Sequence, residues 1–112
     1  MANRRRGEVA ATLGGERYTL CLTLGALAEL EDAFAVADLA ALGARLGSGR
    51  LSAEDLAKLL GAGLRGGGHE IADESIRAWP AACLPEVASA VAELLAATFG
   101  EGGENPREPQ AD

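Results

Sequence analysis

The stretch over residues 6–34 constrains this chain most, because it predicts a β-hairpin that passes into a helix with almost no linker. Residues 8–13 and 17–22 have the composition of two short strands, separated by Gly14-Gly15. A Gly-Gly pair tolerates the positive φ angles that a two-residue hairpin turn requires. The sequence therefore predicts a tight hairpin at the N-terminal side of the fold.

This turn fixes the pairing of the two strands. With Gly14 and Gly15 as the loop, Ala11 faces Tyr18 and Val9 faces Leu20. One register then sorts both strands into an apolar and a polar face, and such agreement is stronger than either strand pattern alone. The apolar face collects Val9, Ala11, Leu13, Tyr18, Leu20 and Leu22. A lone hairpin is marginal in water, and the helix after Thr23 is the nearest candidate to cover this face.

Apolar residues spaced three or four apart predict helices along the rest of the chain. The predicted fold class is α+β, mostly α: a β-hairpin followed by four to five short helices in one domain over residues 1–99. Residues 100–112 carry prolines, glycines and acids without a large apolar side chain, which predicts a disordered acidic tail. The expected helices cover residues 24–34, 39–46, 52–65, 73–79 and 85–99.

Polar residues and prolines set the expected helix ends. Thr23 and Asp38 are plausible N-caps of the first two helices, and Ser52 with Asp55 forms a near capping box at the third. Pro85 suits the first turn of the last helix, because its missing N–H would be unpaired there. In the first helix, Leu24, Leu27, Leu30 and Phe34 form the stripe expected to face the core.

The charge balance and the apolar content limit the classes of partner. A net charge of −7 disfavours nucleic-acid binding, and Arg4-Arg5-Arg6 is the single basic run. No apolar run approaches a membrane span, no signal peptide is evident, and both cysteines are expected to be reduced, so we expect a cytoplasmic protein. The 24 alanines nearly equal the 25 Leu, Ile, Val and Phe residues, so the core is thin. A thin core favours a homo-oligomer or a protein partner.

Two motifs resemble catalytic or cofactor sequences, and both are better explained by structure. The letters Gly61-Ala-Gly-Leu-Arg-Gly66 match G-x-G-x-x-G, but they fall at the end of a helix, where carbonyl groups repel phosphate. His69-Glu70 begins like a zinc motif, but His69 is the one histidine in the chain and is expected in a solvated loop. We predict no enzyme, no cofactor and no metal site.

Four segments together resemble the tail-assembly chaperone family of gene transfer agents and related siphophages, whose members are also labelled tail tube proteins. The segments are RGEV (6–9), LGGERYTLCLTLGALAELED (13–32), LAALGARL (39–46) and LLGAGLRGGG (59–68), and the resemblance covers most of residues 3–95. Ala35 departs from this pattern, because a glycine is expected at the end of the first helix.

The resemblance implies a role in phage tail morphogenesis, without catalysis. Proteins of this family look like chaperones that bind the long helical tape-measure protein and present it to the tail tube protein. The candidate partner surface is Leu39, Leu42 and Leu46 together with Trp79, unless all four fill the core. Two alternatives stay open: a structural tail tube subunit that remains in the particle, and a small regulatory protein-interaction module.

Overall fold

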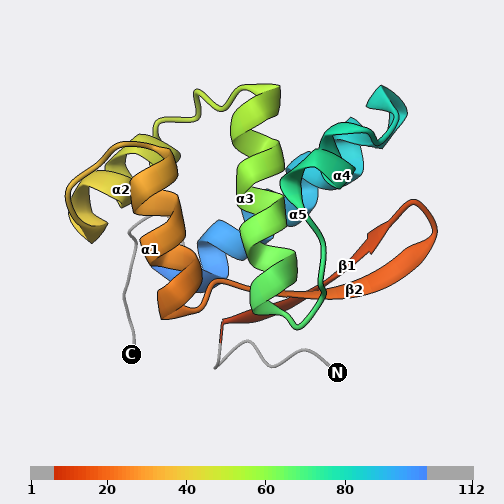
Figure 1. Ribbon diagram of the computed structural model, residues 1–112, viewed down its shortest axis with the longest axis horizontal. Coiled ribbons are helices and arrows are strands. Elements are labelled where there is room, and N and C mark those ends of the chain that lie inside the picture. The colour runs from red at the N-terminus through yellow and green to blue at the C-terminus, as the bar shows by residue number, and fades with distance from the viewer. Residues whose placement is uncertain (1–6, 101–112) are drawn as a thin grey trace, which may run out of the picture.

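A two-stranded hairpin leads into a set of helices wrapped around one central helix, α3 (Figure 1). The computed structural model describes residues 7–100. This architecture confirms the predicted α+β, mostly α fold class. The elements are β1 (Glu8–Leu13), β2 (Glu16–Cys21), α1 (Leu24–Ala33), α2 (Leu39–Gly47), α3 (Ala53–Gly66), α4 (Asp73–Arg77), the short 3-10 helix η2 (Ala81–Cys83) and α5 (Leu84–Phe99).

The hairpin has the predicted register. Ala11 pairs with Tyr18 and Val9 with Leu20 in an antiparallel ladder. Gly14 and Gly15 form the turn with φ angles of 61° and 87°, which side-chain-bearing residues rarely adopt. β2 begins and ends one residue earlier than predicted, because Glu16 already pairs with Leu13.

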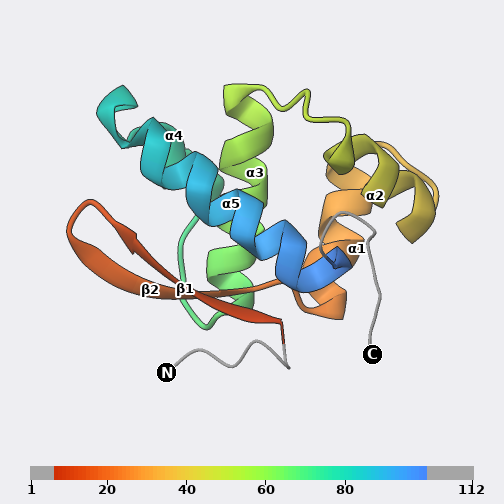
Figure 2. The ribbon, with the colours of Figure 1, turned by 180° about the vertical axis from the view of Figure 1, so that it is seen from behind.

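The apolar face of the hairpin is covered by α3 and α5, and not chiefly by α1 as the sequence suggested. β2 packs on α3, and β1 packs on α5, which crosses the back of the molecule (Figure 2). α1 lies against the other side of α3. The hairpin is therefore closed by the two longest helices, which follow it only after 30 or more residues. Its buried side chains are Val9, Leu13, Leu20 and Leu22.

The predicted helix starts are confirmed by their capping hydrogen bonds. The Thr23 and Asp38 side chains accept from the backbone N–H groups of Ala26 and Ala41. At α3, the Ser52 hydroxyl accepts from the Asp55 N–H, and the Asp55 carboxylate accepts from the Ser52 N–H, both at 3.0 Å. This reciprocal pair satisfies two backbone donors that a helix start otherwise leaves unpaired.

One side chain of the first helix is not buried as the sequence predicted. Leu27 and Leu30 are buried as expected, and Phe34 is partly buried. Leu24, assigned to the same stripe, is 82% exposed. It occupies the first position of α1, where the chain arriving from β2 places it outside the contact with α3.

The ends of α1 and α3 have the same backbone motif with different residues. After α3, the His69 N–H donates to the Leu64 carbonyl, and Gly68 has a φ of 101°. After α1, the Val36 N–H donates to the Glu31 carbonyl, and Ala35 occupies the equivalent left-handed position with a φ of 55°. This conformation is strained for alanine, so the structure locates the departure seen in the sequence at a position that favours glycine.

The glycines at the end of α3 serve tight packing as well as helix termination. A Cβ atom on Gly66 would lie 1.9 Å from the carbonyl oxygen of Cys21, and one on Gly67 would lie 1.8 Å from that of Thr19. The end of α3 and the backbone of β2 therefore meet without an intervening side chain. This close approach explains the last glycine of the G-x-G-x-x-G motif, Gly66.

The last helix is more apolar than the sequence analysis stated. The 19-residue helical stretch Ala81–Phe99 is long and apolar enough to cross a membrane by length and composition, which corrects the statement that no run approaches that length. Here one side of α5 closes the core through Val87, Ala90, Val91 and Leu94. The predicted disordered tail lies outside the described residues except for Gly100, as do Arg4, Arg5 and Arg6.

Candidate functional site

The four residues assigned to a partner surface do not lie together. Leu42 is 0% exposed and Leu46 is 3% exposed, so these two side chains fill the core, which corrects their assignment to an exposed surface. Leu39, on the same helix, is 45% exposed. Trp79 is partly buried and lies beyond α4, away from α2. Among the four, Leu39 and Trp79 are thus accessible to another protein.

Trp79 borders an apolar groove between α3, α4 and the start of α5. α4 is a single short helix that Pro80 halts, and the chain then turns through η2 into α5. This turn brings the first residues of α5 opposite the first half of α3. The groove has a volume of about 290 Å³, and its apolar lining is Ala53, Leu56, Ala57, Ile76, Trp79, Pro80, Ala81, Cys83, Leu84 and Val87.

The floor and the walls of this groove, which we call the Trp79 groove, differ in exposure. Ala57, Ile76 and Val87 are buried and form its floor. Trp79 is half-buried and Leu84 is 49% exposed at its border. The indole N–H of Trp79 has no hydrogen-bond partner among residues 7–100. A wide aromatic surface with a free donor is well suited to a protein interface.

A bidentate ion pair stands at the rim of the Trp79 groove. The Arg77 guanidinium donates to both carboxylate oxygens of Glu54, with Nε 2.8 Å from Oε1. These hydrogen bonds lower the pKa of Glu54 below its ordinary value and raise that of Arg77. The pair connects α3 to α4 across the groove entrance. The rim of the groove therefore carries one positive and one negative charge, with no excess of either sign at this pair.

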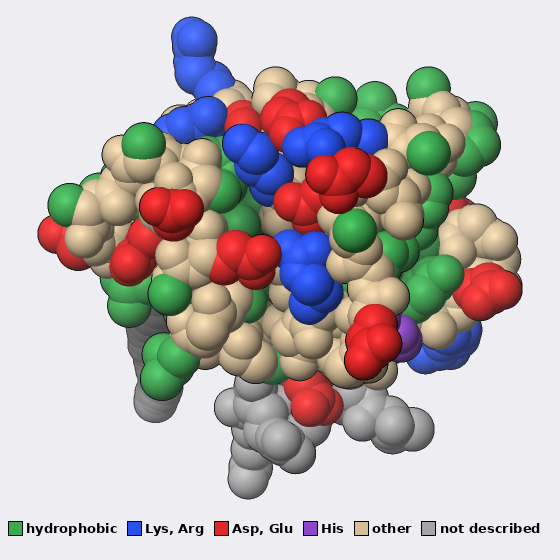
Figure 3. Space-filling model, viewed as in Figure 1, with side chains coloured by type: hydrophobic (Ala, Val, Ile, Leu, Met, Phe, Trp, Pro, Cys, Tyr) green, Lys and Arg blue, Asp and Glu red, His purple; other side chains and the backbone are tan. Residues whose placement is uncertain are grey.

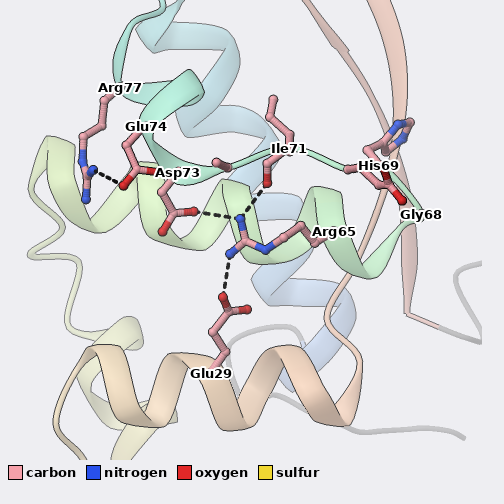
Figure 4. A pocket seen from close by; sticks show the side chains of 10 residues that line it. Glu29, Arg65, Gly68, His69, Ile71, Asp73, Glu74 and Arg77 are labelled. Atoms are coloured by element: carbon pink, nitrogen blue, oxygen red, sulfur yellow. Dashed lines mark hydrogen bonds and ion pairs between the residues drawn. The ribbon is translucent and has the colours of Figure 1, made fainter.

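The face seen in Figure 3 carries interleaved acidic and basic side chains, and a larger hollow of about 790 Å³ opens on it. At its centre, Arg65 donates to Asp73 at 3.0 Å, to Glu29 at 2.7 Å and to the Ile71 carbonyl at 2.9 Å (Figure 4). One guanidinium thus joins α1, α3, α4 and the loop before α4. We call this set the Arg65 network.

The Arg65 network depends on another small residue of α3. A Cβ atom on Gly61 would lie 2.1 Å from Oδ1 of Asp73, so this glycine makes room for the carboxylate over the helix. Partial burial acts to lower the pKa of Arg65, but the hydrogen bonds and charges of Asp73 and Glu29 outweigh it and raise the pKa. The charges of this hollow are thereby engaged in holding helices together.

His69 lies in a more structured setting than the solvated loop expected for it. Its Nε2 accepts from the backbone N–H of Thr19 at 3.4 Å, and its ring packs edge-on to Tyr18 at 5.1 Å between centroids. The histidine therefore caps the outer edge of β2. Among residues 7–100, no three His, Cys, Asp or Glu side chains gather in a group that could hold a metal ion.

Sequence reasoning found one residue of the Trp79 groove and missed the rest of its border. Trp79 was part of the candidate partner surface, whereas Leu56, Ile76 and Leu84 were not assigned to any site. Their meeting depends on the angle between α4 and α5, for which no local pattern exists. The signal that could have indicated it is Leu84, a large apolar residue directly before Pro85 at a helix start.

Comparison with known proteins gives the family. Searches of curated proteins and of solved structures returned no match. A family model described as "Phage tail tube protein, GTA-gp10" matches residues 6–101, which include all of the hairpin and the helices. The chain therefore belongs to this phage tail family and has a phage tail-related role.

Proposed function

We propose that this protein is a tail-assembly chaperone, which binds the long helical tape-measure protein in the cytoplasm and presents it to the tail tube protein, without catalysis. The proposal refines the phage tail-related role of the family. The observation that carries it is the Trp79 groove, an apolar hollow that no described residue of this chain fills.

The groove has the properties of a site for an amphipathic helix. Such a helix lays apolar side chains spaced three and four apart into a hydrophobic groove. Trp79 and Leu84 offer accessible apolar surface at the border, and the buried floor gives a partner side chain a dry environment. The partner is therefore expected to insert two or three large apolar residues from one face of a helix.

The charge of the chain suits temporary binding. A net charge of −7 keeps a complex soluble while hydrophobic segments of the partner are covered. The groove is short, because α4 has only five residues. Several copies along one long helical partner would each contribute a modest affinity, and incoming tube subunits could then displace them one at a time.

The decisive experiment is co-expression with the tape-measure-like protein encoded nearby, followed by size-exclusion chromatography. We expect co-elution and recovery of the long protein from the insoluble fraction. A tape-measure protein that is equally soluble without this chain would remove the basis of the proposal.

Two variants link that result to the groove. Leu84→Asp places a charge at the groove border, at a side chain that is 49% exposed, and should abolish the rescue. Leu24→Asp is the matched control, because Leu24 is 82% exposed on α1 and an acid at a helix start is favourable. Equal loss with both variants, or with neither, contradicts a role for the groove.

The alternative of a tail tube subunit is suggested by the family description itself. The two functions differ in the fate of the protein. A chaperone leaves before the particle is complete, whereas a tube subunit stays in it at ring-like stoichiometry. Quantitative mass spectrometry of purified particles separates them: abundant copies per particle favour the tube subunit, and their loss during assembly favours the chaperone.

A further inference from the structure

The one histidine of the chain, His69, joins the end of α3 to the outer edge of β2. Its backbone N–H ends the helix by donating to the Leu64 carbonyl at 2.9 Å. Its ring lies edge-on to Tyr18, and its Nε2 accepts from the Thr19 N–H at 3.4 Å. The ring therefore links two segments that lie 50 residues apart in the sequence.

The Thr19 N–H depends on this ring for its hydrogen bond. Successive residues of a strand point their N–H groups to opposite sides of it. Because the Thr19 N–H points to His69, the N–H of the next residue, Leu20, points into the ladder with β1. Within residues 7–100, the His69 ring is the acceptor that the Thr19 N–H has.

The neutral imidazole alone can make this contact. A neutral ring accepts at one nitrogen and carries its proton on the other, so here Nδ1 carries the proton. A second proton would go to Nε2 and place a donor opposite the N–H of Thr19. Histidine ordinarily changes its charge between about pH 5 and 8. The contact is therefore present at the upper end of this range and is lost as the pH falls.

The charged groups around His69 leave one acid available to a protonated ring. The hollow that His69 lines also carries Glu29, Arg65, Glu70, Asp73, Glu74 and Arg77, from α1, α3, α4 and the loop before α4. Both of these arginines are already paired with acids. On β2, the ionisable neighbours of Thr19 are Arg17, Tyr18 and Cys21. Arg17 acts against proton uptake, whereas Glu70, which is exposed and without an ion pair in the described part of the chain, favours it.

We propose that His69 is a pH-sensitive clamp, which holds the end of α3 on β2 while it is neutral and releases the Thr19 N–H when it is protonated. The release is local. Gly66 and Gly67 still pack against the carbonyls of β2, and Arg65 still donates to the Ile71 carbonyl in the loop that leads to α4. Protonation thus opens one backbone position on the outer edge of β2 and leaves the hairpin folded. This inference does not depend on the proposed chaperone function.

The main test is amide hydrogen exchange of the full chain, followed by NMR at a series of pH values. Protection is expressed as the intrinsic exchange rate at each pH divided by the observed rate. The protection of the Thr19 N–H should fall about three- to tenfold between pH ~8 and pH ~5, as expected for the loss of one hydrogen bond. Leu20 is the internal control and should keep its protection. Unchanged protection at Thr19, or an equal fall at Leu20, overturns the proposal.

Two variants separate the acceptor from the packing of the ring. His69→Gln keeps an acceptor that does not titrate, so Thr19 should stay protected throughout the pH series. His69→Phe keeps an aromatic ring against Tyr18 without an acceptor, so Thr19 should be unprotected throughout. Protection that still falls with pH in His69→Gln, or that persists in His69→Phe, contradicts the proposal.

A measurement on the unmodified protein avoids the risk that a variant fails to fold. The NMR shifts of the imidazole nitrogens distinguish the two neutral tautomers. We expect the proton on Nδ1 at pH ~8, where the ring is neutral. A proton on Nε2 at that pH would mean that the ring does not accept from Thr19 and would overturn the proposal.

Discussion

The two halves of α3 use small residues for opposite purposes. In the second half, Gly63, Gly66 and Gly67 let α5 and β2 approach until no space remains. In the first half, Ala53 and Ala57 face the Trp79 groove and leave it open. In this protein, small residues of α3 close an interface where another helix or strand packs directly on them. Where the neighbouring element is a single short helix, the same kind of residue leaves a site.

The closed half should be the more sensitive to added volume. Gly67→Ala places a Cβ 1.8 Å from the Thr19 carbonyl oxygen, a backbone atom that cannot rotate away. We expect a loss of at least about 3 kcal/mol in the free energy of unfolding, measured by urea denaturation.

Gly47→Ala is the control for that substitution. Gly47 ends α2, and nothing lies within 4 Å of the position its Cβ would take. Alanine there should be neutral or stabilise by about 0.5–1 kcal/mol. Equal destabilisation at both positions would show that the contact with β2 is not the reason why position 67 requires glycine.

The open half should be sensitive in binding more than in folding. Trp79→Ala removes the largest side chain at the groove, and we expect a loss of about 2 kcal/mol or more in affinity for a tape-measure helix, measured by calorimetry. Because Trp79 is only half-buried, the loss in unfolding free energy should be smaller than for Gly67→Ala. The reverse order would make Trp79 a core residue rather than an interface anchor.

The capping pair at the start of α3 should make the free energy of unfolding depend on pH. The hydrogen bond from the Ser52 backbone, opposed by burial and aided by Arg45, lowers the pKa of Asp55. A lowered pKa in the folded state means that this stabilisation is present above the unfolded pKa, near 3.9, and is lost as the pH falls through the folded pKa.

Asp55→Asn should therefore cost about 1–2 kcal/mol at pH 7, as the loss of a cap and an ion pair does. Urea denaturation across a pH series should show wild type and variant converging below pH ~4, as the Asp55 carboxylate takes up a proton. A difference that stays constant across the series would mean that the charge of Asp55 has no part in the effect.

The smallest expected effect is that of a glycine placed at the end of α1. Ala35 occupies a left-handed position that Gly68 occupies at the end of α3. Ala35→Gly should raise the free energy of unfolding by about 1 kcal/mol, since the strain of alanine there exceeds the entropy that glycine adds to the unfolded chain. Thermal denaturation measures it, and a lower melting temperature would show that Ala35 makes contacts worth more than its strain.

The features predicted from the sequence are those with a local physical cause. Gly14-Gly15 set the parity of the hairpin, so the pairing of Val9 with Leu20 followed. Ser52 and Asp55 lie three residues apart, so their reciprocal cap could be read directly. The cover of the hairpin by α3 and α5 could not, because it depends on contacts between segments far apart in the sequence. The border of the Trp79 groove could not be predicted for the same reason, and the sequence left open whether Leu42 and Leu46 lie at a partner surface or in the core.

The Arg65 network also determines how α4 can respond to a bound molecule. α4 supplies one wall of the Trp79 groove, and on its opposite side Asp73 is tethered by Arg65 to the body of the protein. Across the groove, Arg77 of the same helix is tied to Glu54 of α3. The position of this wall, and with it the width of the groove, therefore depends on two ion pairs that lie outside its apolar lining.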